Sequence, residues 1–156
     1  KGSTVMDTLG LGFCWNDIEV GYRFKTIGRT ITEADIVNFI GCTGMVEVLF
    51  TDLEYRAAHA PDYGRVAPAA LVYAIAEGLL VQATMQQTGL AFLNMELDVR
   101  GPTRAGDTVH AECEVIECRP TSRNRGLVRT RNDIINQNGE TVITYTPLRL
   151  MAGRES

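Results

Sequence analysis

The most reactive stretch of the chain surrounds a single carboxylate. Glu47 is flanked by Val46, Val48 and Leu49, and burial among such apolar neighbours raises the pKa of a carboxyl group towards neutrality. A carboxyl group with that pKa serves as both a general acid and a general base. The alternative interpretation is a loop glutamate that faces solvent, and the sequence favours neither of the two.

Three further candidates follow Glu47. Asp52 precedes a short polar segment that is predicted to be helical, so capping of that helix is favoured over catalysis. His59 lies on the same predicted helix, where it either reaches back into a cleft or faces solvent or an interface. Tyr63 either lines a pocket or packs as a core or interface aromatic.

Arginines gather late in the chain, at Arg119, Arg123 and Arg125, with Arg129 and Arg131 just beyond. Because a guanidinium group binds two phosphate oxygens at once, this group predicts a phosphate clamp. The alternative is a solvated, charged sheet edge that discourages aggregation.

Composition argues against several classes of partner. The chain has 156 residues, of which 45% are hydrophobic and 22% charged, and this suits one domain with its own core. The net charge of -4 argues against a nucleic acid or an anionic membrane as partner. No apolar run is long enough to span a bilayer, and the chain opens without a signal-like segment, so we expect a cytoplasmic protein. The chain has no group of His, Cys, Asp and Glu with metal-ligand spacing, so we expect no metal.

The first half of the chain predicts one strand followed by helices. Tyr22–Thr30 reads as the strand. Thr32 is then a helix N-cap with acidic residues in the first turn, and Gly44 ends that helix. The buried face of the helix is expected to contain Ile36, Val37, Phe39 and Ile40.

A long apolar helix is predicted from Ala69 to about Gln86. Pro68 occupies its N1 position, where the missing N–H costs nothing. Apolar side chains occur on almost every side, so we expect this helix to be the most buried element. Gly89 ends it.

Residues after Gly89 alternate between apolar and polar types with a period of two, which predicts half-buried antiparallel strands. Along the first of them, Leu93, Met95, Leu97 and Val99 are expected to share one face. The four predicted strands are 93–100, 108–115, 126–136 and 141–150. They predict an α+β fold, in which a four-strand antiparallel meander wraps around the apolar helix.

These elements form one unit in the sequence. Residues 1–12 are rich in Gly and Thr without periodicity and are expected to form a flexible N-terminal arm. Residues 13–153 contain every predicted element without a linker or repeat, and are expected to form a single domain.

Taken together, these pieces resemble the MaoC-like acyl-CoA hydratases and dehydratases, from Phe13 to Leu150. The resemblance implies the hot-dog fold, an antiparallel sheet wrapped around a long central helix. It rests on the order and spacing of several short motifs: Thr32-x-x-Asp35, Gly44 with Phe50-Thr51-Asp52, Glu54-Tyr55-Arg56-Ala57, Gly64-Arg65-Val66-Ala67, Gly101-Pro102-x-x-x-Gly106-Asp107-Thr108, Arg125-Gly126-Leu127-Val128, and Asn136-Gln137-x-Gly139-Glu140.

The catalytic motif of that family reads G-D-x-N-P-x-H-x-D, and the same stretch here runs from Gly44 to Asp52. Met45 stands in the place of the acid and Phe50 in the place of the histidine, the two residues that position and activate water. Neither a thioether nor a phenyl ring transfers a proton. Glu47, in the place of the asparagine, is the ionisable side chain that remains within the reactive stretch.

The resemblance also implies how a substrate is held. A thioester carbonyl would lie at the start of the long helix, where backbone N–H groups and the helix dipole point at it. Since Pro68 has no N–H, Ala69 or Ala70 supplies the donor. Arg123 and Arg125 would hold the phosphates of coenzyme A. The substrate would be an acyl-CoA or acyl-carrier thioester, and hydration or dehydration of a thioester needs no cofactor.

Three functions are compatible with this sequence. The first is a hydro-lyase acting on an enoyl or 3-hydroxyacyl thioester, with Glu47 in place of the usual dyad. The second is a non-catalytic acyl-CoA-binding partner subunit of a hydratase. The third is a hot-dog thioesterase in which Glu47 or Asp52 activates water. The free edge of a wrapped sheet predicts a homodimer, with a trimer of dimers or a heteromer with an active hydratase chain as alternatives.

Overall fold

The computed structural model describes residue 2 and residues 4–155 of the chain. The helices are η1 (Trp15–Asp17), α1 (Glu33–Thr43), α2 (Val48–Thr51), α3 (Leu53–His59), η2 (Pro61–Tyr63) and α4 (Ala69–Thr84). The strands are β1 (Arg23–Lys25), β2 (Arg29–Thr30), β3 (Gly89–Asn94), β4 (Leu97–Val99), β5 (Thr108–Pro120), β6 (Arg125–Ile135), β7 (Thr141–Tyr145) and β8 (Leu148–Ala152).

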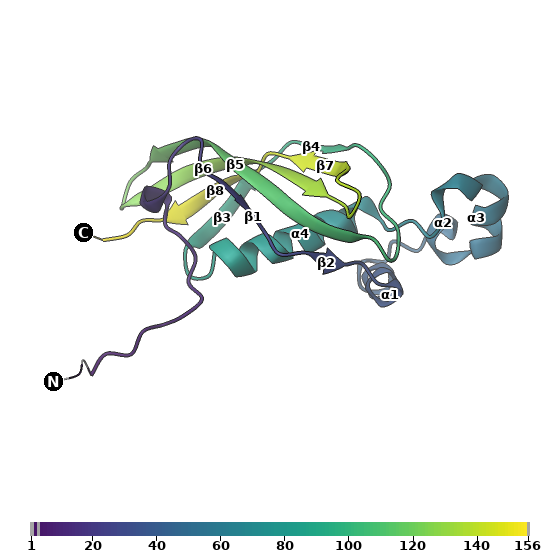
Figure 1. Cartoon of the computed structure of the whole chain (residues 1–156), viewed down its shortest axis with the longest axis horizontal. Coiled ribbons are helices and arrows are strands. Elements are labelled where there is room, and N and C mark those ends of the chain that lie inside the picture. Colours follow the sequence, from purple (N-terminus) through teal and green to yellow (C-terminus); the bar gives the residue numbers. More distant parts are fainter. Residues whose placement is uncertain (1, 3, 156) are drawn as a thin grey trace.

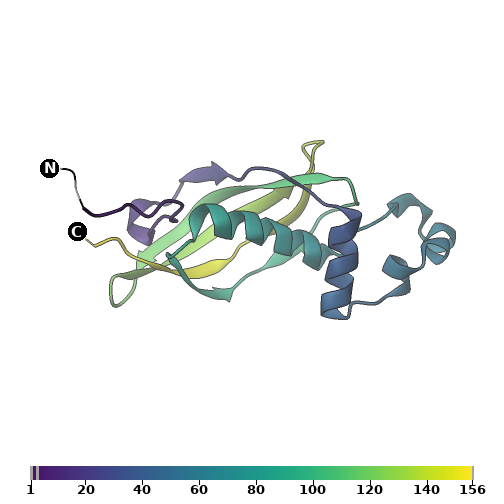
Figure 2. The same cartoon turned by 90° about the horizontal axis from the view of Figure 1, so that it is seen from below.

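All strands belong to one antiparallel sheet (Figure 1). The long hairpin of β5 and β6 forms its centre, with β1 and β2 beside β5 and with β7 and β8 beside β6. β4 pairs with β7 and β3 with β8, so β3 and β4 form one free edge. Figure 2 shows α4 lying across one face of the sheet. The prediction of an α+β hot-dog fold, a sheet wrapped around a long central helix, is confirmed.

The predicted strand order is wrong at one place. A meander puts residues 93–100 beside β5, whereas β3 and β4 lie at the far edge of the sheet. The connection from β4 to β5 crosses the end of the sheet, where Thr103 O accepts a hydrogen bond from Ala67 N–H at 2.7 Å. Leu93 and Val99, which the alternation assigns to a buried face, are therefore exposed at the edge.

Two segments that were each predicted as one strand are divided into two strands in the structure. The segment 141–150 divides into β7 and β8 at Pro147, because proline has no N–H to donate to a ladder. Tyr22–Thr30 divides into β1 and β2 beside Thr26. There the Thr26 hydroxyl oxygen accepts a hydrogen bond from Ala111 N–H at 3.0 Å. A side-chain oxygen thus takes the place that a backbone carbonyl would have in a continuous ladder.

The α1 helix has both of its predicted ends. The Thr32 side chain accepts from Asp35 N–H at 3.1 Å, and Asp35 accepts from Thr32 N–H at 2.9 Å, which is a capping box. Gly44 ends the helix in the left-handed conformation with φ of 74°. Ile36 is buried as predicted, but Val37 is 55% exposed because it lies on the solvent side of the helix.

The α4 helix begins at Ala69, so Pro68 is its N-cap rather than its N1 residue. It ends at Thr84, two residues before the predicted end. The prediction that it is the most buried element is wrong, because six of its 16 residues are buried, against three of five in β7. The sheet curves around one side of α4 only, which leaves Ala70, Ala74 and Val81 exposed on the other side.

Residues 4–12 precede the sheet without regular secondary structure. Three of their apolar side chains, Val5, Met6 and Leu9, are highly exposed, and the segment leads away from the sheet (Figure 1). Among the described residues, no helix combines the length and apolar character needed to cross a membrane.

The packed face of α4 gives a stability prediction. Leu79 is buried at 8% exposure, so Leu79→Ala should lower the free energy of unfolding by about 2–5 kcal/mol. Val81, two residues later, is 40% exposed, and Val81→Ala should cost about 0.5 kcal/mol or less. Urea unfolding of both variants measures the difference, and equal losses would contradict the one-sided packing of α4.

Candidate active site

An apolar cavity of about 290 Å³ lies at the N-terminal end of α4. Its walls come from α2, η2, the segment before α4, the start of α4, β4, the β4–β5 connection and β7. No Asp, Glu, His, Lys, Arg or Cys lines it, and its only side-chain hydroxyl groups belong to Tyr63 and Thr103. The lining residues include Phe50, Tyr63, Ala69, Val72, Val99 and Ile143.

The start of α4 points unpaired donors at this cavity. The carbonyl of Pro68 accepts from Leu71 N–H and Val72 N–H, at 3.0 and 3.2 Å. In the described part of the chain, no backbone or capping acceptor is found for Ala69 N–H or Ala70 N–H. Ala69 lines the cavity, so its N–H and the positive end of the helix dipole lie at the cavity wall, with Ala70 the next residue of the helix.

Phe50 and Met45, which stand in the places of the family's histidine and acid, have different surroundings. Phe50 is partly buried, lines the cavity and packs against the main core. Met45 is 39% exposed and is not part of the cavity wall. A phenyl ring therefore faces the space where the family motif would present an imidazole, and it offers neither a proton nor an acceptor.

Arginine side chains fix the cavity wall through backbone carbonyls. Arg65 binds the Glu33 carboxylate with two nitrogens, at 2.7–3.0 Å, and also donates to the carbonyl of Phe50. These hydrogen bonds hold the pKa of Glu33 below its ordinary value. Arg104 donates from Nε to the carbonyl of Tyr63 at 2.7 Å. Neither role was predicted from the sequence, because each contact joins residues that lie well apart in the chain.

The structure does not bring the predicted proton-transfer residues into the cavity. Glu47 is exposed before α2, so the burial that its predicted role requires is not found. Asp52 accepts from Tyr55 N–H at 2.9 Å, which confirms the capping interpretation. His59 is exposed and stacks on the Tyr55 ring at 4.2 Å between centroids. All three lie on or next to the α2–α3 segment, which projects beyond the end of the sheet (Figure 1).

The remaining predicted residues fall at opposite ends of the molecule. Tyr63 and Ala69 line the cavity, and Ala70 is the next residue of α4. Arg123 and Arg125 lie at the β5–β6 turn, whereas the cavity lies near the start of β5. A strand of 13 residues spans roughly 40 Å, so these arginines are not brought to the cavity within one chain.

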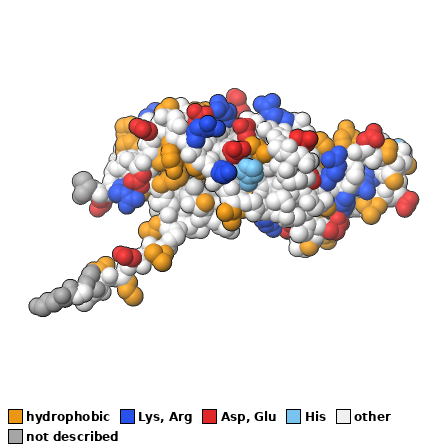
Figure 3. Space-filling model, viewed as in Figure 1, with side chains coloured by type: hydrophobic (Ala, Val, Ile, Leu, Met, Phe, Trp, Pro, Cys, Tyr) orange, Lys and Arg blue, Asp and Glu red, His pale blue; other side chains and the backbone are white. Residues whose placement is uncertain are grey.

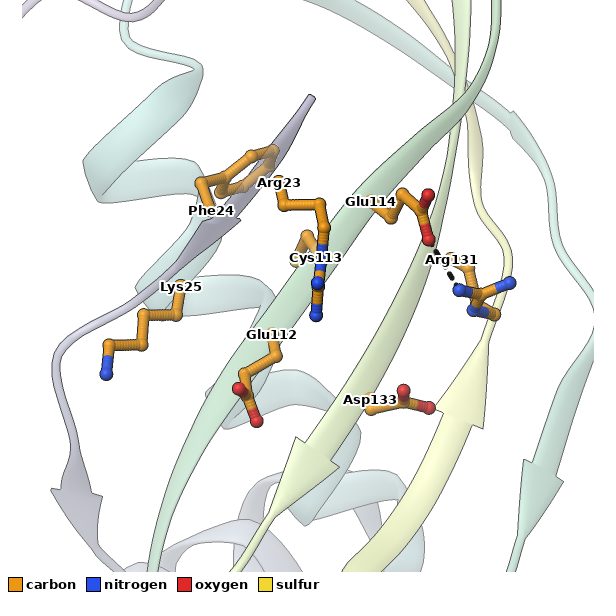
Figure 4. Close-up of a pocket in the computed structure, with 8 residues that line it drawn as sticks. All are labelled: Arg23, Phe24, Lys25, Glu112, Cys113, Glu114, Arg131 and Asp133. Atoms are coloured by element: carbon orange, nitrogen blue, oxygen red, sulfur yellow. Dashed lines mark hydrogen bonds and ion pairs between the residues drawn. The ribbon is translucent and has the colours of Figure 1, made fainter. Parts of the chain in front are cut away.

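A second depression, of about 280 Å³, lies on the sheet surface over β1, β5 and β6 (Figure 4). Its rim alternates in charge, with Arg131 bound to Glu114 at 2.6 Å and Arg23 paired across the ladder with the same glutamate. Figure 3 shows charged side chains of both signs gathered over this part of the sheet. Such a surface is solvated and suits no acyl chain. The described residues also contain no group of three or more His, Cys, Asp or Glu side chains placed to bind a metal.

Comparison with known proteins agrees with the fold. A family model described as the FAS1-like dehydratase domain region matches residues 19–145. A 3-hydroxybutyryl-CoA dehydratase of Methylorubrum extorquens is 27% identical over 131 residues, which are 83% of this chain and 82% of that protein. The crystal structure of a MaoC-like dehydratase from Rhodospirillum rubrum is 28% identical, with a TM-score of 0.78, over 93% of this chain and all of that one.

The fold is shared more widely than the sequence. A Mycobacterium tuberculosis protein described as having a double hot-dog fold matches 93% of this chain with a TM-score of 0.81. It is 22% identical, and the match covers 46% of its own length. The fold and the family match together place the chain in the class of hot-dog dehydratases. Within that class, the chain belongs to the MaoC-like, FAS1-like dehydratase family.

The Arg65 contacts predict how the cavity wall is held. Hydrogen bonds to charged groups are worth about 1.5–3 kcal/mol, so Arg65→Ala should speed proteolysis within residues 45–63 about tenfold or more. Arg131→Ala, which removes an exposed contact with Glu114, is the matched control and should leave the rate unchanged. Cleavage at the same rate in all three proteins would contradict the anchoring role of Arg65.

Proposed function

We propose that this chain binds the acyl part of a CoA or carrier-protein thioester in the cavity without carrying out proton transfer itself. The observation that carries the proposal is the lining of the cavity, which contains no acid, base or imidazole. The family acts as hydratases and dehydratases, so the chain would serve as the acyl-binding subunit of such an activity.

The geometry supports binding in three ways. Ala69 N–H and Ala70 N–H are available to a thioester carbonyl at the positive end of α4. The walls formed by Phe50, Val72 and Ile143 suit an apolar chain and exclude water from it. Hydration, by contrast, requires a base that takes a proton from water and an acid that protonates C2. Phe50 supplies neither.

A hydro-lyase activity is the second candidate, and the family match favours it. In that case Glu47 or His59 would have to move from the exposed α2–α3 segment towards the cavity, or another chain would supply the dyad. The two candidates differ in whether the purified chain turns over what it binds.

Calorimetry with crotonyl-CoA, followed by product analysis of the same sample, tests the proposal. We expect binding, no 3-hydroxybutyryl-CoA and no release of free CoA. The variant Met45→Asp with Phe50→His should gain hydration by about 10²–10⁴-fold over background, because it restores an acid–base pair. Glu47→Gln should leave binding unchanged.

Three results would contradict the proposal. Turnover by the wild-type chain that Glu47→Gln abolishes would establish a hydro-lyase with Glu47 as its catalytic residue. Release of free CoA would establish a thioesterase. Absence of binding by any acyl-CoA would remove both the binding and the catalytic interpretation.

We further propose that two copies pair through β3. This strand pairs with β8 on one side only, and all six of its residues are exposed. They include Leu90, Phe92 and Leu93, and the Phe92 ring lies 5.2 Å from the Arg149 guanidinium. An exposed apolar edge strand of this kind is prone to aggregate unless another strand pairs with it. The β3 strand of a second copy, paired antiparallel, would bury this edge. A trimer of dimers would need a further interface.

Sedimentation velocity at micromolar concentration tests this pairing. The wild-type protein should sediment as a dimer, with twice the chain mass of 17.1 kDa, and Phe92→Asp should sediment as a monomer. Ile27→Asp is the control, because it places the same charge on an exposed apolar residue that does not belong to β3. A wild-type monomer would contradict the homodimer and favour a heteromer with another hydratase chain.

A further inference from the structure

One amide side chain is buried in the core between α4 and the sheet. Asn132 lies on β6 and is 1% exposed, with Cys113 opposite it on β5 and Tyr145 opposite it on β7. Among the described residues, no hydrogen-bond donor reaches its Oδ1 atom. Because a buried amide oxygen without a partner destabilises a fold, a further partner is expected at this atom.

Tyr145 determines which way the Asn132 amide points. The Tyr145 hydroxyl donates its hydrogen to Glu77 at 2.7 Å, so it can only accept from a second neighbour. Burial and the adjacent Glu77 raise the pKa of Tyr145, and a hydrogen bond from Asn132 opposes that rise. The donor in this contact is the amide nitrogen, because the amide oxygen has no hydrogen. The amide oxygen therefore points away from Tyr145.

A cavity of about 20 Å³ adjoins Asn132, between α4 and the strands β6 and β8. Its polar lining residues are Thr84, Thr130, Asn132 and Arg149, and the other lining residues are apolar. A buried water molecule needs about 10–15 Å³ and two to four polar partners. The cavity therefore has the size and the lining for one water molecule.

The hydrogen-bonding character of the lining selects water over an ion. Asn132 Oδ1 can only accept a hydrogen bond, whereas the Arg149 guanidinium can only donate. Glu77 accepts from one nitrogen of that guanidinium, which leaves further N–H groups for another acceptor. A cation would be repelled by the guanidinium, and an anion by the amide oxygen. Water accepts from the first group and donates to the second.

We propose that one ordered water molecule binds in this cavity, accepts a hydrogen bond from Arg149 and donates one to Asn132 Oδ1. This water closes a ring of hydrogen bonds that runs through Glu77, Tyr145, Asn132 and Arg149. The ring joins α4 to β6, β7 and β8, so the water helps to hold the helix in place across the sheet. The inference is independent of the proposed acyl binding.

A high-resolution crystal structure of the wild-type chain tests the site without any substitution. We expect one water molecule within hydrogen-bond distance of both Asn132 Oδ1 and a nitrogen of Arg149. A cavity without water density would overturn the proposal. An Arg149 side chain that donates directly to Asn132 Oδ1 would also overturn it.

Filling the cavity measures what the water contributes to stability. Val128 is 3% exposed and lines the cavity, so Val128→Ile adds a carbon where the water would lie. Displacing the water leaves Asn132 Oδ1 unpaired, so the equilibrium constant for unfolding in urea should rise about tenfold more than in an Asn132→Leu background. Any packing strain from the added carbon is common to both backgrounds and cancels in this comparison.

Val142→Ile is the matched control, because Val142 is 2% exposed and does not line this cavity. Its effect should be equal in the two backgrounds. Equal effects of Val128→Ile in the two backgrounds would contradict the stabilising role of the water. If Asn132→Leu fails to fold, the wild-type crystal structure still decides whether the water is bound. Neither result changes the expected acyl-CoA binding, which calorimetry tests separately.

Discussion

The positions of the cavity walls depend on how α4 is fixed across the sheet. Glu77, halfway along the helix, accepts hydrogen bonds from the Tyr145 hydroxyl at 2.7 Å and from the Arg149 guanidinium. Its partners lie on β7 and β8, so one carboxylate joins the helix to the strands on both sides of the Pro147 break. Burial, together with the adjacent Glu77, raises the pKa of Tyr145, which keeps that hydroxyl a donor. Buried ion pairs add little net stability, but they set register.

With that register set, the N-terminal end of α4 can lie in one place only. Val72 and Leu80 pack against strand residues of the same core cluster. Ala69 is thereby held at the cavity wall, and the β4–β5 connection closes the other side. Loss of the family's acid and histidine leaves this architecture intact, because neither residue is needed for packing. The fold and the apolar cavity are both present with Met45 and Phe50 at those two positions.

Much of the fold was predictable, because it follows from local patterns. The alternation along β5 and β6 shows directly in their burial, and the Thr32 capping box was readable from residue types and spacing. The placement of β3 and β4 at the far edge was not predictable, since alternation carries no information about which strand lies alongside. The same holds for Glu77, whose partners lie about 70 residues away in the chain.

Only part of the site was predictable. Ala69 lines the cavity as expected, because the start of a buried helix is recognisable in the sequence. Tyr63 also lines it, although its sequence neighbours left open whether it would pack in the core instead. Glu47 was a candidate because of its apolar neighbours, yet those neighbours lie on a projecting segment and do not bury it. The contacts of Arg65 depend on tertiary structure that no local pattern records.

A crystal structure of the chain with butyryl-CoA would show directly whether the cavity binds an acyl group. We expect the acyl chain to lie between Phe50 and Val72, with its carbonyl oxygen within hydrogen-bond distance of Ala69 N–H or Ala70 N–H. We also expect no carboxylate or imidazole within reach of C2 or C3 of the acyl group. An acyl chain bound elsewhere, or a Glu47 or His59 side chain turned onto those carbons, would contradict the proposal that the chain binds acyl groups without transferring protons.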